Sequence, residues 1–190
     1  MPNQSEYTHE QVLNDVWSCL REGAKRGVHP FHTPVLATIN GGDPDLRTVV
    51  LRQAVEKQRL LLCHTDVRSP KFFALEETPQ AAWLFYDRGA KVQLRLYGRV
   101  SLHHADSIAQ TRWEKSSSNS RLCYLTPQAP GAVLPFGDGQ TPAADDGFEN
   151  FAVISCEVIT IDWLYLRAAG HLRARFDWNE SRWDSEWINP

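Results

Sequence analysis

Several features that often identify a function are missing from this chain. Its four cysteines, Cys19, Cys63, Cys123 and Cys156, form no CxxC pair, and its seven histidines form no HxxxH or HExxH pattern, so the sequence predicts no metal site. No apolar run approaches the roughly 20 residues of a membrane span, and the N-terminus has no apolar signal region. A formal net charge of −3 argues against a basic footprint for nucleic acid over the whole surface. We therefore expect a cytoplasmic protein whose cysteines are reduced core residues.

The chain does have enough length and apolar sequence for one domain with a sizeable core. It contains 190 residues, of which 42% are hydrophobic, as in globular proteins. No internal repeat or second-domain boundary is visible, so residues 1–190 are expected to form a single domain. We divide it into an N-terminal helix at about 8–24, a core barrel at about 33–103 and 150–190, and an insertion of helices and loop at about 104–149.

Turn signals and apolar patterns predict a mainly β (α+β) architecture. Thr8 and Gln11 form a capping box that begins the first helix, and Ser69 with Pro70 begins a short second one. Helices are expected at 8–24, 69–78, 105–117 and 119–126, and strands at 33–40, 46–54, 59–65, 81–86, 90–103, 151–166, 171–178 and 182–188. A loop rich in proline, glycine and alanine follows at 127–147, and it is either ordered and functional or mobile. Six or more antiparallel strands with a few peripheral helices indicate a closed or partly closed β-barrel.

The stretch "RTVVLR", residues 47–52, is a buried-strand pattern closed at each end by an arginine. Charged groups are rarely buried without a partner. Side chains on a strand alternate faces, so in an ideal strand Arg47 and Arg52 would point to opposite sides. This raises the question of what each guanidinium group holds.

A further cation stands near the start of the helix expected at 69–78. Lys71 takes the second helical position, where it opposes the helix dipole, which favours anions at that end. One interpretation is an ordinary solvated lysine. The other is a phosphate site, because helix N-termini offer free N–H groups to anions, while Ser69 adds a hydroxyl group and Lys71 a charge. Arg47 lies on a strand that could sit beside this turn.

Several motifs, in this order, resemble those of the pyridoxamine 5′-phosphate oxidase family of FMN-binding proteins. They are "RTVVLR", "HTDVRSPK", "WLFYDRGAKVQLRLYGRV", "HLRARF" and the final "WINP". The spacing in "RWEKSSSNSRLCYLTPQAPG" is most similar to the branch called the Alr4036-type FMN-binding domain. The resemblance covers about residues 33–190 and implies a split β-barrel and a homodimer with FMN at the subunit interface.

The resemblance also implies roles for individual residues. Arg47 and Lys71, with Ser69 beside them, would bind the FMN phosphate, whereas Arg52 would lie near the flavin ring and the substrate. The other implied flavin contacts are the backbone of Thr48, Val49, Val50 and Leu51, together with His64, Thr65, Gln93, Gln128, Tyr165 and Arg175. Gln128 and Arg175 would come from the partner chain. His171 and Arg173 take family substrate positions, in swapped order.

Some positions depart from the family pattern. Pro70 replaces an arginine that helps to hold the phosphate, and Ala174 replaces an acidic residue. The nearby candidates for holding a substrate phosphate are Arg112, Lys115, Ser118 and Arg121. The resemblance therefore implies FMN binding more directly than pyridoxamine phosphate oxidation, and we expect an FMN-dependent oxidoreductase with an unknown small substrate.

Two alternatives stay open. One is a non-enzymatic flavin-binding or carrier protein on the same barrel. The other is a nucleic-acid-binding barrel that uses its seven tryptophans as a stacking platform. The acidic net charge favours core and interface roles for these tryptophans instead.

Overall fold

The structure, a computed structural model, describes residues 7–134 and 147–190, so part of the loop expected at 127–147 lies outside the described residues. Its strands are β1 (Val35–Asn40), β2 (Asp43–Thr48), β3 (Gln53–Val55), β4 (Leu60–Asp66), β5 (Gln80–Asp87), β6 (Val92–His104), β7 (Phe151–Tyr165), β8 (Leu172–Trp178) and β9 (Trp183–Trp187). Its α-helices are α1 (His9–Lys25), α2 (Pro70–Glu77), α3 (Ser107–Glu114) and α4 (Ser118–Arg121). Most predicted elements are therefore confirmed, including the C-terminal hairpin.

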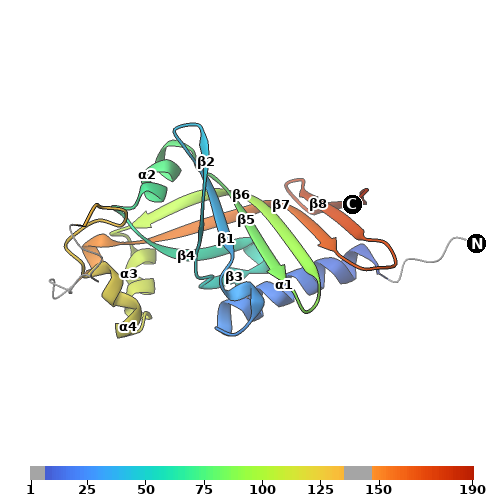
Figure 1. The fold of residues 1–190 in the computed structure, drawn as a ribbon, viewed down its shortest axis with the longest axis horizontal. Coiled ribbons are helices and arrows are strands. Elements are labelled where there is room, and N and C mark those ends of the chain that lie inside the picture. Colours follow the sequence, from blue (N-terminus) through green and yellow to red (C-terminus); the bar gives the residue numbers. More distant parts are fainter. Residues whose placement is uncertain (1–6, 135–146) are drawn as a thin grey trace, which may run out of the picture.

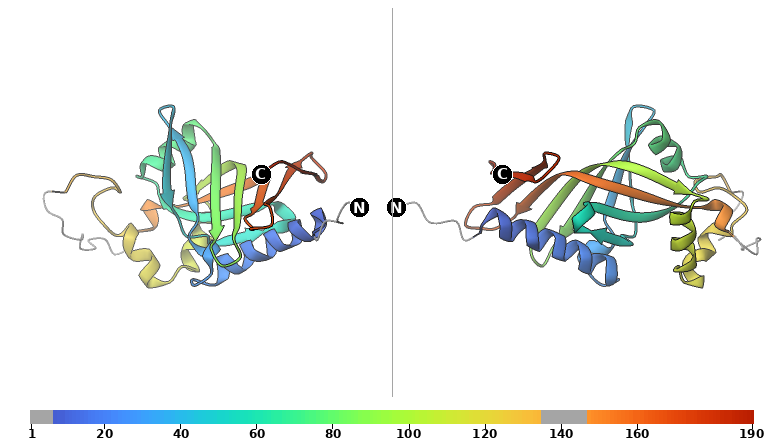
Figure 2. Two further views of the ribbon diagram at one scale, coloured as in Figure 1. Left: turned by 45° about the vertical axis from the view of Figure 1, so that its right-hand side comes forward. Right: turned by 180° about the vertical axis from the view of Figure 1, so that it is seen from behind.

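The strands form one antiparallel sheet that curls into a split barrel (Figures 1 and 2). Along the main path their order is β2-β1-β5-β6-β7-β4-β3. One edge of β7 pairs with β6, but its other edge is divided. Residues 151–157 of β7 pair with β4, and residues 160–165 pair with β8. The β8–β9 hairpin, red in Figure 1, therefore leaves the barrel at the middle of β7, and the predicted mainly β split barrel is confirmed.

The prediction of one strand across "RTVVLR" is wrong, because the chain changes its hydrogen-bonding partner there. Residues 49–52 separate β2 from β3. The Val49 N–H group donates to Pro34 O at 2.9 Å, whereas the Arg52 N–H group donates to Leu62 O at 2.8 Å. This segment thus carries the chain from the β1 side of the barrel to the β4 side. Strand alternation therefore does not decide where the two arginines point.

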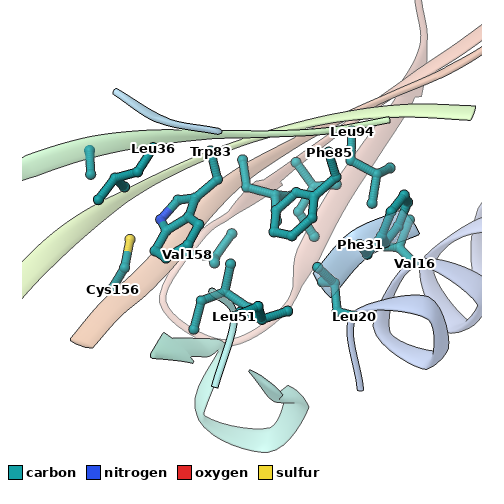
Figure 3. Close-up of a cluster of buried hydrophobic side chains, with 14 of the residues drawn as sticks. Val16, Leu20, Phe31, Leu36, Leu51, Trp83, Phe85, Leu94, Cys156 and Val158 are labelled. Atoms are coloured by element: carbon teal, nitrogen blue, oxygen red, sulfur yellow. The ribbon is translucent and has the colours of Figure 1, made fainter. Parts of the chain in front are cut away.

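α1 runs along the barrel and supplies part of its core (Figures 1 and 3). The predicted capping box is present, with reciprocal bonds between Thr8 and Gln11. The apolar stripe of the helix is buried against η1 (Pro30–His32) and the inner face of the sheet. Figure 3 shows side chains from both sides of this contact, including Val16, Leu20, Phe31 and Phe85. Burial of each large apolar side chain contributes about 1.5–3 kcal/mol, so this contact fixes α1 on the barrel.

A second, smaller core lies under the helical insertion. It contains Leu62, Ala109, Trp113, Tyr124, Phe151 and Val153. Trp113 packs on Phe151 with ring centroids 5.2 Å apart. This cluster holds α3 against the start of β7, and so it places the residues that follow α3 beside β4.

The cysteines and tryptophans follow the expectations only in part. Cys63 and Cys156 are buried, but Cys123 is exposed beside α4, so the expectation of a core position is wrong for Cys123. All four thiols are free. The buried tryptophans, which have the predicted core role, are Trp17, Trp83, Trp113 and Trp163. No helix in the described part of the chain is long and apolar enough to cross a membrane.

Gly98 marks the irregular point in the long β6–β7 pairing. The register shifts between Tyr97 and Gly98. A Cβ atom on Gly98 would lie 2.3 Å from Glu157 O and 2.6 Å from Cys156 Sγ, which no side chain can tolerate without backbone movement. The glycine therefore permits the close approach of the two central strands.

Candidate functional site

The three residues assigned to the phosphate, Arg47, Ser69 and Lys71, lie around the first turn of α2 together with Thr65. Thr65, at the end of β4, and Ser69, just before α2, are buried, with their hydroxyl oxygens 3.0 Å apart. Arg47 reaches the region from β2, and its guanidinium group donates to Leu36 O at 3.2 Å and to Thr38 Oγ1 at 2.9 Å. These bonds hold Arg47 in one orientation over β1.

The positive charge at this turn is only partly neutralised. Arg47 forms an ion pair with Asp45. Lys71 is half-buried and has no ion pair among residues 7–134 and 147–190. Burial, and then the nearby charge of Arg47, hold the pKa of Lys71 below its usual value. Like charges kept together in this way favour an anionic ligand that would bridge them, such as a phosphate group.

The helix start itself offers few donors. Pro70 has no N–H group, the Ser69 N–H group donates to Asp66 O at 3.1 Å, and the Phe72 N–H group donates to Ser69 O at 2.9 Å. The Ser69 hydroxyl group also donates to Asp66 O, at 2.7 Å, so it does not cap α2. The side chains of Arg47 and Lys71 must therefore supply most of the attraction for a phosphate.

The crossing at residues 48–51 can give a flavin less contact than the resemblance implies. Val49 and Leu51 are buried, and Figure 3 shows Leu51 among the core side chains. Their N–H groups donate to Pro34 O and His32 O, each at 2.9 Å. Val50 is half-buried, and its N–H group has no hydrogen bond within the described ranges. Thr48 is exposed at the end of β2, so Val50 and Thr48 are the members of this segment that face outward.

Arg52 lies in a separate, strongly cationic pocket of about 350 Å³. The pocket is lined by Arg52, His64, Arg112, Lys115, Ser116, Ser117 and Ser120. Arg112 also donates to the side chain of Gln53, which ties α3 to β3. The lining holds three permanent cations, three hydroxyl groups and no carboxylate, so the pocket is suited to an anion that also accepts hydrogen bonds.

His64 lines this pocket, and its surroundings lower its pKa. Burial lowers its pKa to about 3, with further contributions from Arg52 and Arg112. Its ring packs on Phe151 with centroids 4.8 Å apart. Its Nε2 atom is buried without a hydrogen-bond partner in the described structure. The imidazole is therefore neutral at physiological pH and presents a polar atom that a ligand could satisfy.

β4 connects the phosphate turn with this pocket. Cys63 is fully buried on β4, and burial raises its pKa to about 12. The charges of Lys71, Arg52 and Arg47 all act on this thiol. The two arginines of "RTVVLR" thus flank β4, Arg47 with Lys71 at the α2 turn and Arg52 in the pocket at His64. We call these two cationic groups together, Arg47 and Lys71 with the lining of the Arg52 pocket, the β4 cationic region.

A different group of expected residues lies on the outer face of the sheet. Gln93, Arg173 and Arg175 share this face by strand register, with Asp162 between them. Arg173 donates to both carboxylate oxygens of Asp162, at 3.0 and 2.7 Å, and Arg95 donates to the same carboxylate at 2.5 Å. Burial alone would raise the pKa of Asp162, but the bonds and charges of Arg173 and Arg95 hold it below its usual value.

This outer face does not meet the β4 cationic region within one chain. Leu36 on β1 pairs with Arg47 on β2 and with Trp83 on β5, and Trp83 pairs in turn with Leu96 on β6. Arg47 and Leu96 therefore lie on the same face of the sheet, the inner face. Gln93 is three residues before Leu96 and therefore points to the outer face. A ligand held by Arg47 and Lys71 could contact Gln93, Arg173 or Arg175 only if these came from a second copy of the chain.

The remaining expected residues lie apart from both groups. Tyr165 alternates with Leu164 on β7 and points to the inner face, where its ring contacts Tyr7 at 5.9 Å. His171 is exposed in the β7–β8 loop and accepts a bond from the Arg167 N–H group at 3.2 Å. Gln128 is exposed in the segment after η3 (Leu122–Tyr124), where the carbonyl groups of Thr126 and Pro127 accept bonds from Arg68.

Two features of the site escaped the sequence analysis. The serines at 116, 117 and 120 line the Arg52 pocket, but serines in a loop carry no distinctive pattern. Asp162 was not singled out, although it is a lone charge in the apolar strand "VITIDWLYL". A charge at such a position needs a partner, and this signal was available.

Comparison with known proteins places the site in a family context. Residues 14–104 match the family model described as pyridoxamine 5′-phosphate oxidase, FMN-binding domain. A pyridoxine/pyridoxamine 5′-phosphate oxidase 2 of Arabidopsis thaliana is 28% identical over 191 residues, which span 92% of this chain and 96% of that protein. These matches confirm the resemblance on which the residue assignments were made.

Solved structures extend the similarity over nearly the whole chain. A pyridoxamine 5′-phosphate oxidase-related, FMN-binding protein from Nostoc punctiforme is 26% identical with a TM-score of 0.78, covering 93% of this chain and 96% of that one. PhzG from Burkholderia lata, solved in complex with tetrahydrophenazine-1-carboxylic acid, has a TM-score of 0.71 over 98% of this chain and 95% of its own. At 17% identity, the second match shows a common fold alone.

Proposed function

We propose that this chain, which is similar in sequence and fold to pyridoxamine 5′-phosphate oxidase-like FMN-binding proteins, binds FMN and oxidises or reduces a small anionic substrate. The observation that carries the proposal is the β4 cationic region. It offers a phosphate-binding turn at Arg47 and Lys71 and a second, separate anion pocket at Arg52. A carrier of FMN alone needs the first of these and not the second.

Each residue of the β4 cationic region has a separate role in this proposal. Arg47 and Lys71 would bind the phosphate and so hold that end of the cofactor at the α2 turn. The flavin supplies the redox chemistry when it is bound, and the protein supplies position and electrostatics. Arg52 would supply positive charge at the pocket end of the cofactor site. Arg112 and Lys115 hold the anionic group of the substrate against the serine hydroxyl groups. Neutral His64 lines the same pocket and can orient the substrate by one hydrogen bond.

We also propose that the active form is a homodimer with FMN at the subunit interface. The outer face of the sheet carries exposed apolar side chains, Ile39, Leu84, Tyr86, Tyr97 and Ile159, that a second copy would cover. The same face carries Gln93, Arg173 and Arg175, which lie on the opposite side of the sheet from Arg47. Pairing two chains through this face would bring these groups to the partner's cofactor.

The experiment is flavin titration followed by turnover. We expect the purified protein to bind FMN, and the bound flavin to lose its absorbance near 450 nm when a reduced donor is added without oxygen and to regain it in air. Small phosphorylated or carboxylated compounds would serve as the donor panel, with uncharged analogues as controls. A flavin that binds but is reduced no faster than free FMN by every donor would refute the oxidoreductase and favour a carrier. Light scattering that gives a 21.6 kDa monomer with FMN bound would refute the dimer.

A further inference from the structure

A cavity of about 420 Å³ lies between α1, the β5–β6 turn and the end of β7. Trp163 and Tyr165 line it from β7. They alternate along the strand with Asp162 and Leu164, so the cavity is on the opposite side of the sheet from the Arg173 face. No lysine or arginine lines it. Its size is within the range of small-molecule sites, and it shares no residue with the β4 cationic region.

Aromatic rings form much of the wall. Tyr7 lies 6.0 Å from Trp163 and 5.9 Å from Tyr165, and Trp163 lies 6.1 Å from Tyr165, measured between ring centroids. The three planes are inclined to one another by 45° to 72°, so they surround a space and do not stack in one column. Phe31 adds a fourth ring. The negative faces of such rings attract cations.

Two carboxylates face the same space from different elements. Asp15 comes from α1 and Asp87 from the end of β5. Neither has an ion pair within the described ranges. Oδ1 of Asp87 accepts bonds from the N–H groups of Gly89 and Ala90, at 2.8 and 3.0 Å, which fixes the carboxylate at the turn. Cys19 lines the same cavity, and burial, followed by the charges of Asp15 and Asp87, raises the pKa of its thiol.

We propose that this cavity, the α1 cavity, binds a small organic cation, a protonated amine or quaternary ammonium group on an apolar body. The rings and the two carboxylates supply the two attractions that such a cation combines. An anion of the same size would meet two like charges and no cation. The site is independent of the proposed flavin chemistry, so its ligand is either a regulator or a second molecule carried by the protein.

Three probes of one shape and different charge test the proposal. Phenethylamine is a cation, 2-phenylethanol is neutral and phenylacetate is an anion, and all three carry a phenyl ring on a short chain. Isothermal titration of the full-length protein is expected to give the order amine, alcohol, acid, with the amine favoured over the alcohol by about five- to twentyfold, as for two partly exposed ion pairs. Equal affinities for amine and alcohol, or no binding of the amine at millimolar concentration, would overturn it.

Variants that remove one carboxylate test whether the amine binds in the α1 cavity. Asp15→Asn and Asp87→Asn should each weaken the amine about two- to fivefold and leave the alcohol unchanged. Asparagine can still accept the turn bonds at position 87, so the fold is kept. Asp43→Asn, on the exposed β1–β2 hairpin, removes the same charge away from the cavity and should change neither. A loss of amine binding as large in Asp43→Asn would show a general charge effect and refute the site. FMN titration of each variant separates this result from the cofactor proposal, because FMN affinity should stay constant.

Discussion

Replacing Lys71 by methionine should weaken FMN strongly without weakening the fold. Lys71 has no ion pair in the described chain, and burial with the charge of Arg47 already disfavours its charged form. Its removal should therefore leave the free energy of unfolding of the apoprotein unchanged or slightly raised. A charge-assisted hydrogen bond contributes about 1.5–3 kcal/mol, and about 1.4 kcal/mol is tenfold in affinity. The expected loss of FMN affinity is thus roughly ten- to a hundredfold.

Arg47→Ala should behave differently, because Arg47 also bonds to β1. Its loss removes the bonds to Leu36 O and Thr38 Oγ1, so the apoprotein should be destabilised by about 1–3 kcal/mol in urea unfolding, in addition to a similar loss of FMN affinity. Lys57→Met, at an exposed position in η2 (Glu56–Gln58), is the matched control and should change neither quantity.

Riboflavin provides the decisive comparison, because it has the ring and ribityl chain of FMN without the phosphate. Fluorescence-quenching titrations should show riboflavin binding unchanged in Lys71→Met, whereas Arg52→Ala should weaken both flavins because Arg52 is assigned to the ring end. If Lys71→Met weakened riboflavin as much as FMN, the phosphate assignment at α2 would be wrong. If it changed neither, the anion site at this turn would be refuted.

Three further predictions concern pH, substrate and packing. The pKa of His64 is about 3 in the fold against an ordinary 6.5, so the unfolded chain takes up the proton first. The free energy of unfolding should therefore fall by about 1.4 kcal/mol per pH unit as the pH drops from 6.5 towards 3. Urea unfolding of His64→Gln should lack this contribution, and an equal dependence of its unfolding free energy on pH would contradict the assignment. Because Arg173 is held by Asp162 and the His171–Arg173 order is swapped, we expect little or no oxidation of pyridoxine or pyridoxamine 5′-phosphate in an oxygen-consumption assay, and robust turnover would show that the swap is tolerated. Gly98→Ala should destabilise the protein by about 1–3 kcal/mol or more because its Cβ would meet Glu157 O, whereas Gly27→Ala, whose Cβ would meet only His32 Nε2 at 3.9 Å, should not.

Local patterns predicted the elements well, but not where strands exchange partners. The capping box of α1 and the C-terminal hairpin depend on neighbouring residues, and both are confirmed. The break at residues 49–52 depends on hydrogen bonds to Pro34 and Leu62. No local pattern reveals it, since residues 48–51 form one continuous run of strand-forming residues.

The candidate site shows the same division. Arg47 stood out because it closes a buried-strand pattern, and Lys71 because it opposes the dipole of α2. That the two lie close together depends on the packing of α2 against β1. The bond between Arg173 and Asp162 depends on the register of β7 and β8, which the sequence does not fix. Tyr165 was assigned to the flavin by alignment, but its parity on β7 turns it to the α1 cavity.

The divided edge of β7 also has a consequence for motion. Within the described residues, the backbone pairing of the β8–β9 hairpin with the rest of the sheet is limited to residues 160–165 of β7. Its side chains add Ala174 and Phe176, which are buried in the main core, and Ser185, 3.0 Å from His9 at the start of α1. Such a peripheral unit opens at a lower free energy than the barrel, so its amide hydrogens should exchange faster than those of β6. Arg173 and Arg175 therefore lie on the strand whose pairing we expect to open before that of β6, and hydrogen exchange at β8 would report this opening separately from that of β4.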